Sequence, residues 1–186
     1  MKIGFIGPGG TGKTTTMDLL QDLLFLERIP SVVRPILLRH HLDEESMSRL
    51  SSEDRWKIQN EMFEARMELE LSLGSRHTMT DRTLLDHAAY CFYYSANVIP
   101  DEIASRMLLD VRKVLETYDK LFYFPLGLFI PPNDGVRKQQ YAYQMTIDFI
   151  MRGILRRVAL GQYVVPAGSP EERASWVRKC VMNLDT

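Results

Sequence analysis

The chain has 186 residues, of which 45% are hydrophobic, 25% charged and 10% aromatic, and its formal net charge is −1. This composition excludes a disordered chain, a collagen-like fibre and a disulfide scaffold. A net charge near zero gives no overall attraction to nucleic acid, although it leaves room for a local basic groove. A chain of this length is expected to form one domain, spanning residues 1–186.

The chain is expected to carry no targeting or membrane signal. Its start, Met1 to Pro8, has one cation and an apolar run too short for a signal peptide. No apolar stretch approaches the roughly 20 residues that cross a bilayer. Cys91 and Cys180 are isolated in the sequence, as expected of reduced thiols in the cytosol. We therefore expect a cytoplasmic protein, in the host cytoplasm if the protein is viral, with no membrane partner.

Short apolar runs alternate along the chain with longer helical patterns. Strands are expected at Lys2–Ile6, Ser31–Arg34, His77–Asp81, Lys120–Phe124 and Tyr163–Val165. Helices are expected at Lys13–Glu27, Ser52–Leu73, Thr83–Ser95, Asp101–Thr117, Gln139–Leu160 and Pro170–Met182. In the second of these helices, the apolar residues Trp56, Phe63, Met67 and Leu71 fall near one face. The alternation predicts an α/β fold, a parallel sheet with helices on both faces.

The strongest motif lies between the first strand and the first helix. It reads Gly-Pro-Gly-Gly-Thr-Gly-Lys-Thr and fits the phosphate-binding pattern G-x-x-x-x-G-K-[ST] without a mismatch. Glycines let backbone N–H groups turn toward phosphate oxygens, the lysine reaches the β- and γ-phosphates, and the last hydroxyl binds Mg²⁺. ATP and Mg²⁺ are the expected cofactors. The expected nucleotide-binding residues are Gly7, Pro8, Gly9, Gly10, Thr11, Gly12, Lys13, Thr14 and Thr15.

A carboxylate and an arginine, Asp81 and Arg82, end the third expected strand. Strand ends at the carboxyl edge of a parallel sheet face the ligand crevice. Asp81 is therefore the candidate to hold Mg²⁺ with Thr14, or to act as a base toward the acceptor. Arg82 is the candidate to bind phosphate or acceptor. A helix cap is the alternative role for Asp81, because aspartate is a favoured N-cap.

The stretches Phe63–Arg66 and Asp81–Tyr90 resemble the thymidylate kinase and nucleoside kinase group. That group has an arginine-bearing helix, then a strand ending in Asp-Arg or Glu-Arg, then a helix with Ala-Tyr. The resemblance implies a P-loop kinase fold, a three-layer sandwich with a lid and a five-stranded sheet in the order 2-3-1-4-5. It also implies that Arg66 and Arg82 face the acceptor.

Later segments resemble the nicotinamide-riboside kinase domains of bacterial NAD regulators. The shared features are a strand, a loop with Asp-Gly-x-Arg and a helix, here Phe122–Pro125 followed by Asn133–Lys138. The resemblance places the loop Pro166–Pro170 near the adenine. Two departures from thymidylate kinases argue against ordinary dTMP specificity. The phosphate loop is uncharged between Gly7 and Gly12, and the second aspartate of the helix, Asp86, comes one residue late.

Cations after the Pro- and Gly-rich loop suit a lid at about residues 125–140. Phosphoryl transfer needs positive charge on the migrating group and exclusion of water, so Arg137 is a candidate catalytic residue, with Lys138 beside it. Arg152 and Arg156 share a helix face by their i, i+4 spacing and can touch ATP phosphates or solvent. Asp86 is a candidate to bind the acceptor. Its alternative roles are to orient Arg82 or to form an ion pair that supports the fold.

Three functions remain in competition at this point. The first is an ATP-dependent kinase acting on a nucleoside- or nucleotide-type acceptor. The second is a kinase of the phage type that phosphorylates 5-hydroxymethyluracil within DNA, a base that must be flipped out of the duplex. The third is a nucleotide-binding NTPase switch, for which the sequence offers no clear switch loop. The acceptor, the catalytic base and the oligomeric state, a homodimer included, are left open.

Overall fold

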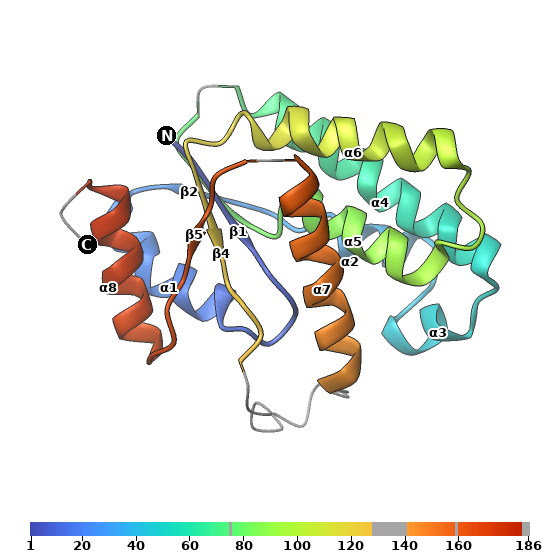
Figure 1. Cartoon of the computed structure of the whole chain (residues 1–186), viewed down its shortest axis with the longest axis horizontal. Helices are drawn as coiled ribbons and strands as arrows, with labels where there is room; N and C mark the ends of the chain where they lie inside the picture. Colours follow the sequence, from blue (N-terminus) through green and yellow to red (C-terminus); the bar gives the residue numbers. More distant parts are fainter. Residues whose placement is uncertain (75, 128–140, 159, 184–186) are drawn as a thin grey trace.

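Five parallel strands form one sheet at the centre of the molecule (Figure 1). The computed structural model describes residues 1–74, 76–127, 141–158 and 160–183. The strands are β1 (Lys2–Ile6), β2 (Glu27–Ile29), β3 (Thr78–Asp81), β4 (Lys120–Tyr123) and β5 (Tyr163–Val164). They pair in the order β2-β3-β1-β4-β5, which confirms the expected α/β class and the order 2-3-1-4-5.

Helices cover both faces of this sheet (Figure 1). They are α1 (Lys13–Leu24), α2 (Val33–Arg39), α3 (Glu44–Arg49), α4 (Ser52–Ser72), α5 (Leu84–Ser95), α6 (Asp101–Leu115), α7 (Tyr141–Val158) and α8 (Pro170–Val181). The pair α1 and α8 packs on one face, and the group α4 to α7 lies on the other. None of the helices in the described ranges is long and apolar enough to cross a membrane.

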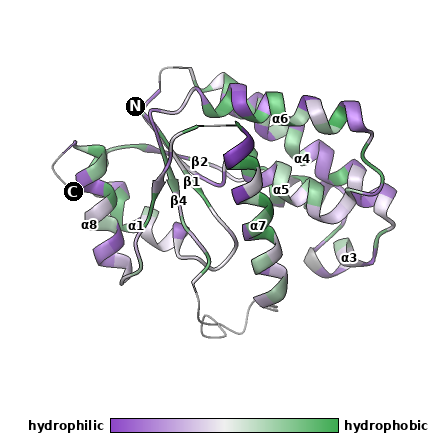
Figure 2. Ribbon diagram, viewed as in Figure 1, coloured by the Kyte–Doolittle hydropathy of each residue, from purple (hydrophilic) through white to green (hydrophobic). Residues whose placement is uncertain are grey.

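Two apolar cores hold the three layers together. On one face Ile3 and Phe5 of β1 pack with Met17 of α1 and Val177 of α8. On the other, Ile6 joins a larger cluster of side chains from α5, α6 and α7. Figure 2 shows the resulting contrast, with hydrophobic colours along α5 and α7 and hydrophilic residues on the outer side of α8. β1 is buried along its whole length because both of its faces are covered.

The second strand lies earlier in the chain than expected. Helix α1 ends at Leu24 because Phe25 adopts a left-handed backbone conformation, with φ of 51°. The chain then turns inward, and the amide of Glu27 donates a hydrogen bond to the His77 carbonyl at 2.9 Å. The prediction of a strand at Ser31–Arg34 was therefore wrong, since Val33 begins the short helix α2.

The structure also differs from the expectations around α4, and most of the expected lid falls outside the described residues. The buried face of α4 includes the charged side chains Arg66 and Glu70, whereas Leu71, expected on the apolar face, is 43% exposed. The turn before α4 holds another unexpected helix, α3, begun by a capping box between Asp43 and Ser46. Of the expected lid, residues 128–140 lie outside the described residues, as do Arg137 and Lys138.

Candidate functional site

The phosphate-binding motif forms the loop between β1 and α1, and two glycines shape it. Gly7 has φ of 149°, and a Cβ atom there would lie 2.4 Å from the Phe124 carbonyl oxygen. Gly12 adopts φ of 85° as the N-cap of α1 and has no side chain that could cap the helix. The first amides of α1 are therefore directed at the loop, as in helix N-termini that bind anions.

The Lys13 side chain lies inside this loop. Its ammonium donates hydrogen bonds to the carbonyl oxygens of Gly7 and Pro8, both at 2.7 Å, and the residue is 4% exposed. The Thr11 hydroxyl also donates to Pro8, at 2.9 Å. Together these bonds hold a positive charge at the point where the loop surrounds its ligand position.

Thr14 and Asp81 meet at the carboxyl edge of the sheet. Asp81 stands at the end of β3, in register with Phe5 of β1, and its Oδ2 accepts a 2.5 Å hydrogen bond from the Thr14 hydroxyl. Its Oδ1 is buried and has no hydrogen-bond partner among the described residues. Hydroxyl and carboxylate oxygens are the ligands that Mg²⁺ prefers, so this pair, with one carboxylate oxygen left over, fits a magnesium ion.

Arg82 follows directly and is held in a strained backbone conformation. Its φ is 70°, and its amide donates to the Phe5 carbonyl at 3.1 Å. The guanidinium carbon lies 5.3 Å from the centroid of the Tyr90 ring. Tyr90, followed by Asp86 and Asp81, raises the pKa of Arg82 against the opposing effect of burial. The arginine therefore stays positively charged beside Asp81.

Asp86 supports the phosphate loop from inside the protein. It is fully buried; Oδ1 accepts from the Gly7 amide at 3.2 Å, and Oδ2 accepts from the Thr83 amide at 2.8 Å. Burial raises the pKa of this carboxyl, while Lys13 and Arg82 lower it. Both oxygens accept from backbone amides, so Asp86 caps α5 and ties that helix to the phosphate loop; a role toward the acceptor stays a prediction.

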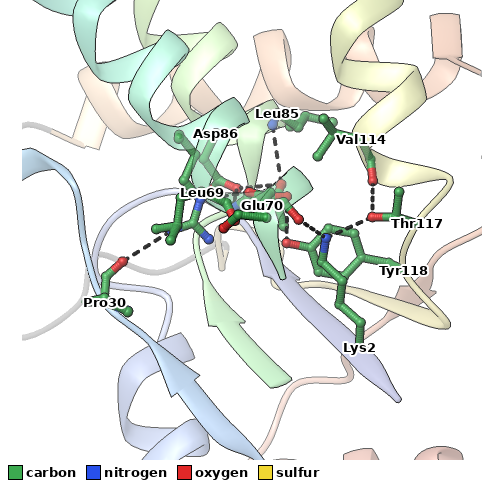
Figure 3. Close-up of polar contacts among 12 residues, drawn as sticks. Lys2, Pro30, Leu69, Glu70, Leu85, Asp86, Val114, Thr117 and Tyr118 are labelled. Carbon is green, nitrogen blue, oxygen red and sulfur yellow. Dashed lines mark hydrogen bonds and ion pairs between the residues drawn. The ribbon is translucent and has the colours of Figure 1, made fainter. Parts of the chain in front are cut away.

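Arg66 is also sealed from solvent. The side chain is 1% exposed; its Nε donates to Glu70 Oε1 at 2.7 Å, and Nη1 donates to the Pro30 carbonyl at 3.3 Å. Figure 3 shows two more hydrogen bonds to Glu70: the Tyr118 hydroxyl donates to its carboxylate, and the Lys2 ammonium donates to its backbone carbonyl. Protein atoms surround the guanidinium in this arrangement, with Nη2 buried and without a hydrogen-bond partner among the described residues, and contact between Arg66 and the acceptor stays a prediction.

A buried histidine belongs to the same region. His87 of α5 is 6% exposed. Burial, then the positive charges of Arg66 and Arg82, lowers its pKa from 6.5 to about 3. The imidazole is therefore neutral at physiological pH and adds no charge next to the two arginines.

Four tyrosines form an aromatic cluster between α5 and the start of α7. Tyr90 and Tyr94 are stacked with ring centroids 6.4 Å apart, and Tyr93 meets both Tyr94 and Tyr143 edge-on. The hydroxyls of Tyr94 and Tyr143 are 3.0 Å apart. Arg82 lies over Tyr90 at one end of the cluster, and Arg55 of α4 lies over Tyr94 at the other. These half-buried rings adjoin the Asp81–Arg82 edge through Arg82.

Sequence reasoning missed one residue that contacts the phosphate loop. Arg173, in the first turn of α8, donates from Nη1 to the Thr11 carbonyl at 2.9 Å. The same nitrogen would lie 3.2 Å from a Cβ at Gly12. The sequence offered one clue to Arg173: it follows shortly after the loop Pro166–Pro170, which was expected near the adenine. Arg173 thus links the start of α8 to the phosphate loop.

Solved structures share this architecture at low sequence identity. Deoxyadenosine kinase from M. mycoides is 18% identical with a TM-score of 0.72, and the match covers 98% of this chain and 100% of that chain. Thymidylate kinase from Ehrlichia chaffeensis is 19% identical with a TM-score of 0.61, and each chain is covered to 98%. NadR protein in complex with NR is 14% identical with a TM-score of 0.68, covering 98% of this chain and 50% of that chain.

These likenesses show the fold. No curated protein sequence matches the chain. A family model described as AAA domain matches residues 2–173, which is most of the chain. The chain therefore belongs to the AAA domain family and has the P-loop fold of the nucleoside and nucleotide kinases.

Proposed function

We propose that the protein is an ATP- and Mg²⁺-dependent kinase that transfers the γ-phosphate to a nucleoside- or nucleotide-type acceptor. The observation that carries the proposal is the Thr14–Asp81 hydrogen bond of 2.5 Å at the mouth of the phosphate loop. It joins a carboxylate to the hydroxyl of the residue after Lys13, and a lysine, a hydroxyl and a carboxylate are the groups that phosphoryl transfer needs.

Each group has a role that follows from its place. Lys13 stabilises negative charge on the migrating phosphoryl group, and the loop amides hold the phosphates. Thr14 and Asp81 would hold Mg²⁺, which neutralises charge on the β- and γ-phosphates when bound. Arg82, charged and next to Asp81, contacts the acceptor or the transferred group. We assign this contact to Arg82 and not to Arg66, because Arg66 is 1% exposed.

The tyrosine cluster is suited to an acceptor that carries a nucleobase. A planar base offers a π-face that stacks on aromatic rings, and this cluster of half-buried rings adjoins Arg82. Similar folds are found in a deoxyadenosine kinase and a thymidylate kinase, whose names state nucleoside and nucleotide acceptors. Both observations support an acceptor that contains a nucleobase. In this proposal Asp81 is the candidate base, and Arg137 of the expected lid is a further candidate cation on the phosphoryl group.

The test is transfer of label from γ-labelled ATP, with Mg²⁺, to a panel of acceptors. The panel holds nucleosides including nicotinamide riboside, nucleoside monophosphates, and DNA with and without 5-hydroxymethyluracil. Label on a free nucleoside or monophosphate, lost in Lys13→Ala, supports the proposal. Label on modified DNA alone assigns a DNA-modifying kinase in its place. Label in released phosphate alone contradicts a kinase and favours an NTPase switch.

A further inference from the structure

A second concave site lies on the far side of β4 from the phosphate loop. Helix α7 runs alongside β4 and β5 at the open edge of the sheet (Figure 1). Between them is a cleft of about 360 Å³ whose lining includes Tyr123, Arg152 and Arg156. That volume falls in the range of small-molecule sites. No residue of the phosphate loop or of the Asp81–Asp86 segment lines it.

The cleft combines positive charge with an apolar floor. Leu155, Leu160 and Val164 supply aliphatic surface, and Arg152 and Arg156 supply two guanidinium groups one helical turn apart. Among the described residues, the lining contains no aspartate or glutamate. A ligand that suits these walls carries an anionic group joined to an apolar body.

The two arginines have donors to spare. Arg152 uses Nε, which donates to Asp148 Oδ2 at 2.8 Å and to the Tyr123 hydroxyl at 3.3 Å. Within the described part of the chain, its two terminal nitrogens make no hydrogen bond, and Arg156 makes no hydrogen bond or ion pair. Asp148 is 4% exposed, so it fixes the Arg152 stem while the side chain remains 53% exposed at the cleft. The geometry is that of a cation held in place with its outer donors available.

We propose that this cleft is a binding site for a small molecule that joins an anionic group, phosphate or carboxylate, to an apolar body. The anion would lie between Arg152 and Arg156, and the apolar body would lie on Leu155, Leu160 and Val164. The site is separate from the phosphate loop and does not depend on the function proposed above.

A simpler role for the basic residues is interaction with the helix dipole, because Arg156 and Arg157 both stand in the last turn of α7. Arg157 therefore provides a matched control. It shares the charge, the helix end and the exposure of Arg156, but it does not line the cleft. A dipole effect is common to both residues, whereas a ligand contact belongs to Arg156 alone.

The experiment is calorimetric titration of the full chain with phenyl phosphate, with phenol and inorganic phosphate as partial probes. Phenyl phosphate is expected to bind more tightly than either partial probe. Arg156→Gln should weaken its binding by about tenfold, the loss of a charge-assisted contact, and Arg157→Gln should leave it unchanged. Lys13→Ala should also leave it unchanged, which separates the cleft from the phosphate loop.

Three results would overturn the proposal. One is equal affinity for phenyl phosphate in wild type and Arg156→Gln. Another is an equal loss in Arg156→Gln and Arg157→Gln, which would reduce the arginines to helix-end charges. The third is binding that Lys13→Ala abolishes and Arg156→Gln preserves, which would place the probe in the phosphate loop. Failure of ATP-dependent transfer affects none of these readouts.

Discussion

Two polar regions of the molecule use similar side chains in opposite ways. At the carboxyl edge of the sheet, Thr14 is exposed and meets Asp81, whose Oδ1 has no partner among the described residues. Beneath α4, Arg66 and Glu70 are 1% exposed each and bond to Tyr118, Lys2 and Pro30 (Figure 3). The first region places its polar pair at an exposed side chain, whereas the second buries its polar atoms, of which Arg66 Nη2 has no hydrogen-bond partner among the described residues.

The difference shows why residue type alone does not identify a functional arginine. A buried ion pair contributes to stability only as a complete set, since an uncompensated buried charge is costly. An edge group such as Asp81 is only partly buried and can exchange its contact with the exposed Thr14 for a metal ion or a ligand. Stability should therefore depend on the buried network, and phosphate transfer should depend on the edge.

The largest effect on stability is expected from Glu70→Ala. This change leaves Arg66 charged and buried without its carboxylate, so the free energy of unfolding should fall by about 3–5 kcal/mol. Denaturant unfolding measures it. Glu68→Ala is the control, because Glu68 lies on the exposed face of the same helix. Equal losses in the two variants would show that the buried Arg66–Glu70 pair contributes no more to the free energy of unfolding than an exposed glutamate.

The next effect concerns magnesium. Asp81→Asn keeps an oxygen that can accept from Thr14 but removes the carboxylate charge, so transfer at low Mg²⁺ should fall about 100-fold. Raising the Mg²⁺ concentration should recover part of the rate, and the unfolding midpoint should stay unchanged. Glu102→Gln, on the exposed first turn of α6, serves as the control. A Mg²⁺ dependence identical to wild type would remove Asp81 from the metal site.

The pH dependence of stability should reveal His87. The pKa of His87 is lowered to about 3 in the folded protein. Between pH 6.5 and pH 3 the imidazole is therefore protonated in the unfolded chain but neutral in the folded chain. Stability is therefore lost as pH falls from 6.5 toward 3, by about 1.4 kcal/mol per pH unit for this group. His87→Gln should flatten that slope, whereas His77→Gln, an exposed site, should not. Parallel slopes in wild type and His87→Gln would contradict the assignment.

The smallest effect is expected at the start of the segment after β4. Asp148 Oδ1 accepts from the Tyr123 hydroxyl and from the Leu126 amide, the latter at 3.2 Å. Asp148→Asn keeps the shape and removes the charge that faces Arg152, so it should lower the free energy of unfolding by about 1 kcal/mol. Hydrogen exchange at Leu126 should rise with it. Unchanged exchange would show that Asp148 does not restrain this segment.

The sequence predicted the parts of the site that local patterns encode. The phosphate loop lies between a strand and a helix, and the carboxyl edge of a parallel sheet brings Asp81 to Thr14 although 67 residues separate them. Contacts between distant side chains were not predictable in this way. Arg173 reaches Thr11 across 162 residues, and whether Arg66 points to a ligand or to Glu70 depends on how α4 packs. The early second strand was missed because the left-handed Phe25 has no glycine to signal it.

The most direct test measures γ-phosphate transfer and unfolding on the same preparations of Lys13→Ala and Glu70→Ala, at a temperature where both are folded. The account predicts opposite outcomes. Lys13→Ala should lose transfer by more than about 100-fold although it is folded at the assay temperature, and Glu70→Ala should lose stability and keep most of its transfer rate. Unchanged transfer in Lys13→Ala, or an equally deep loss of transfer in folded Glu70→Ala, would contradict the separation between the two regions.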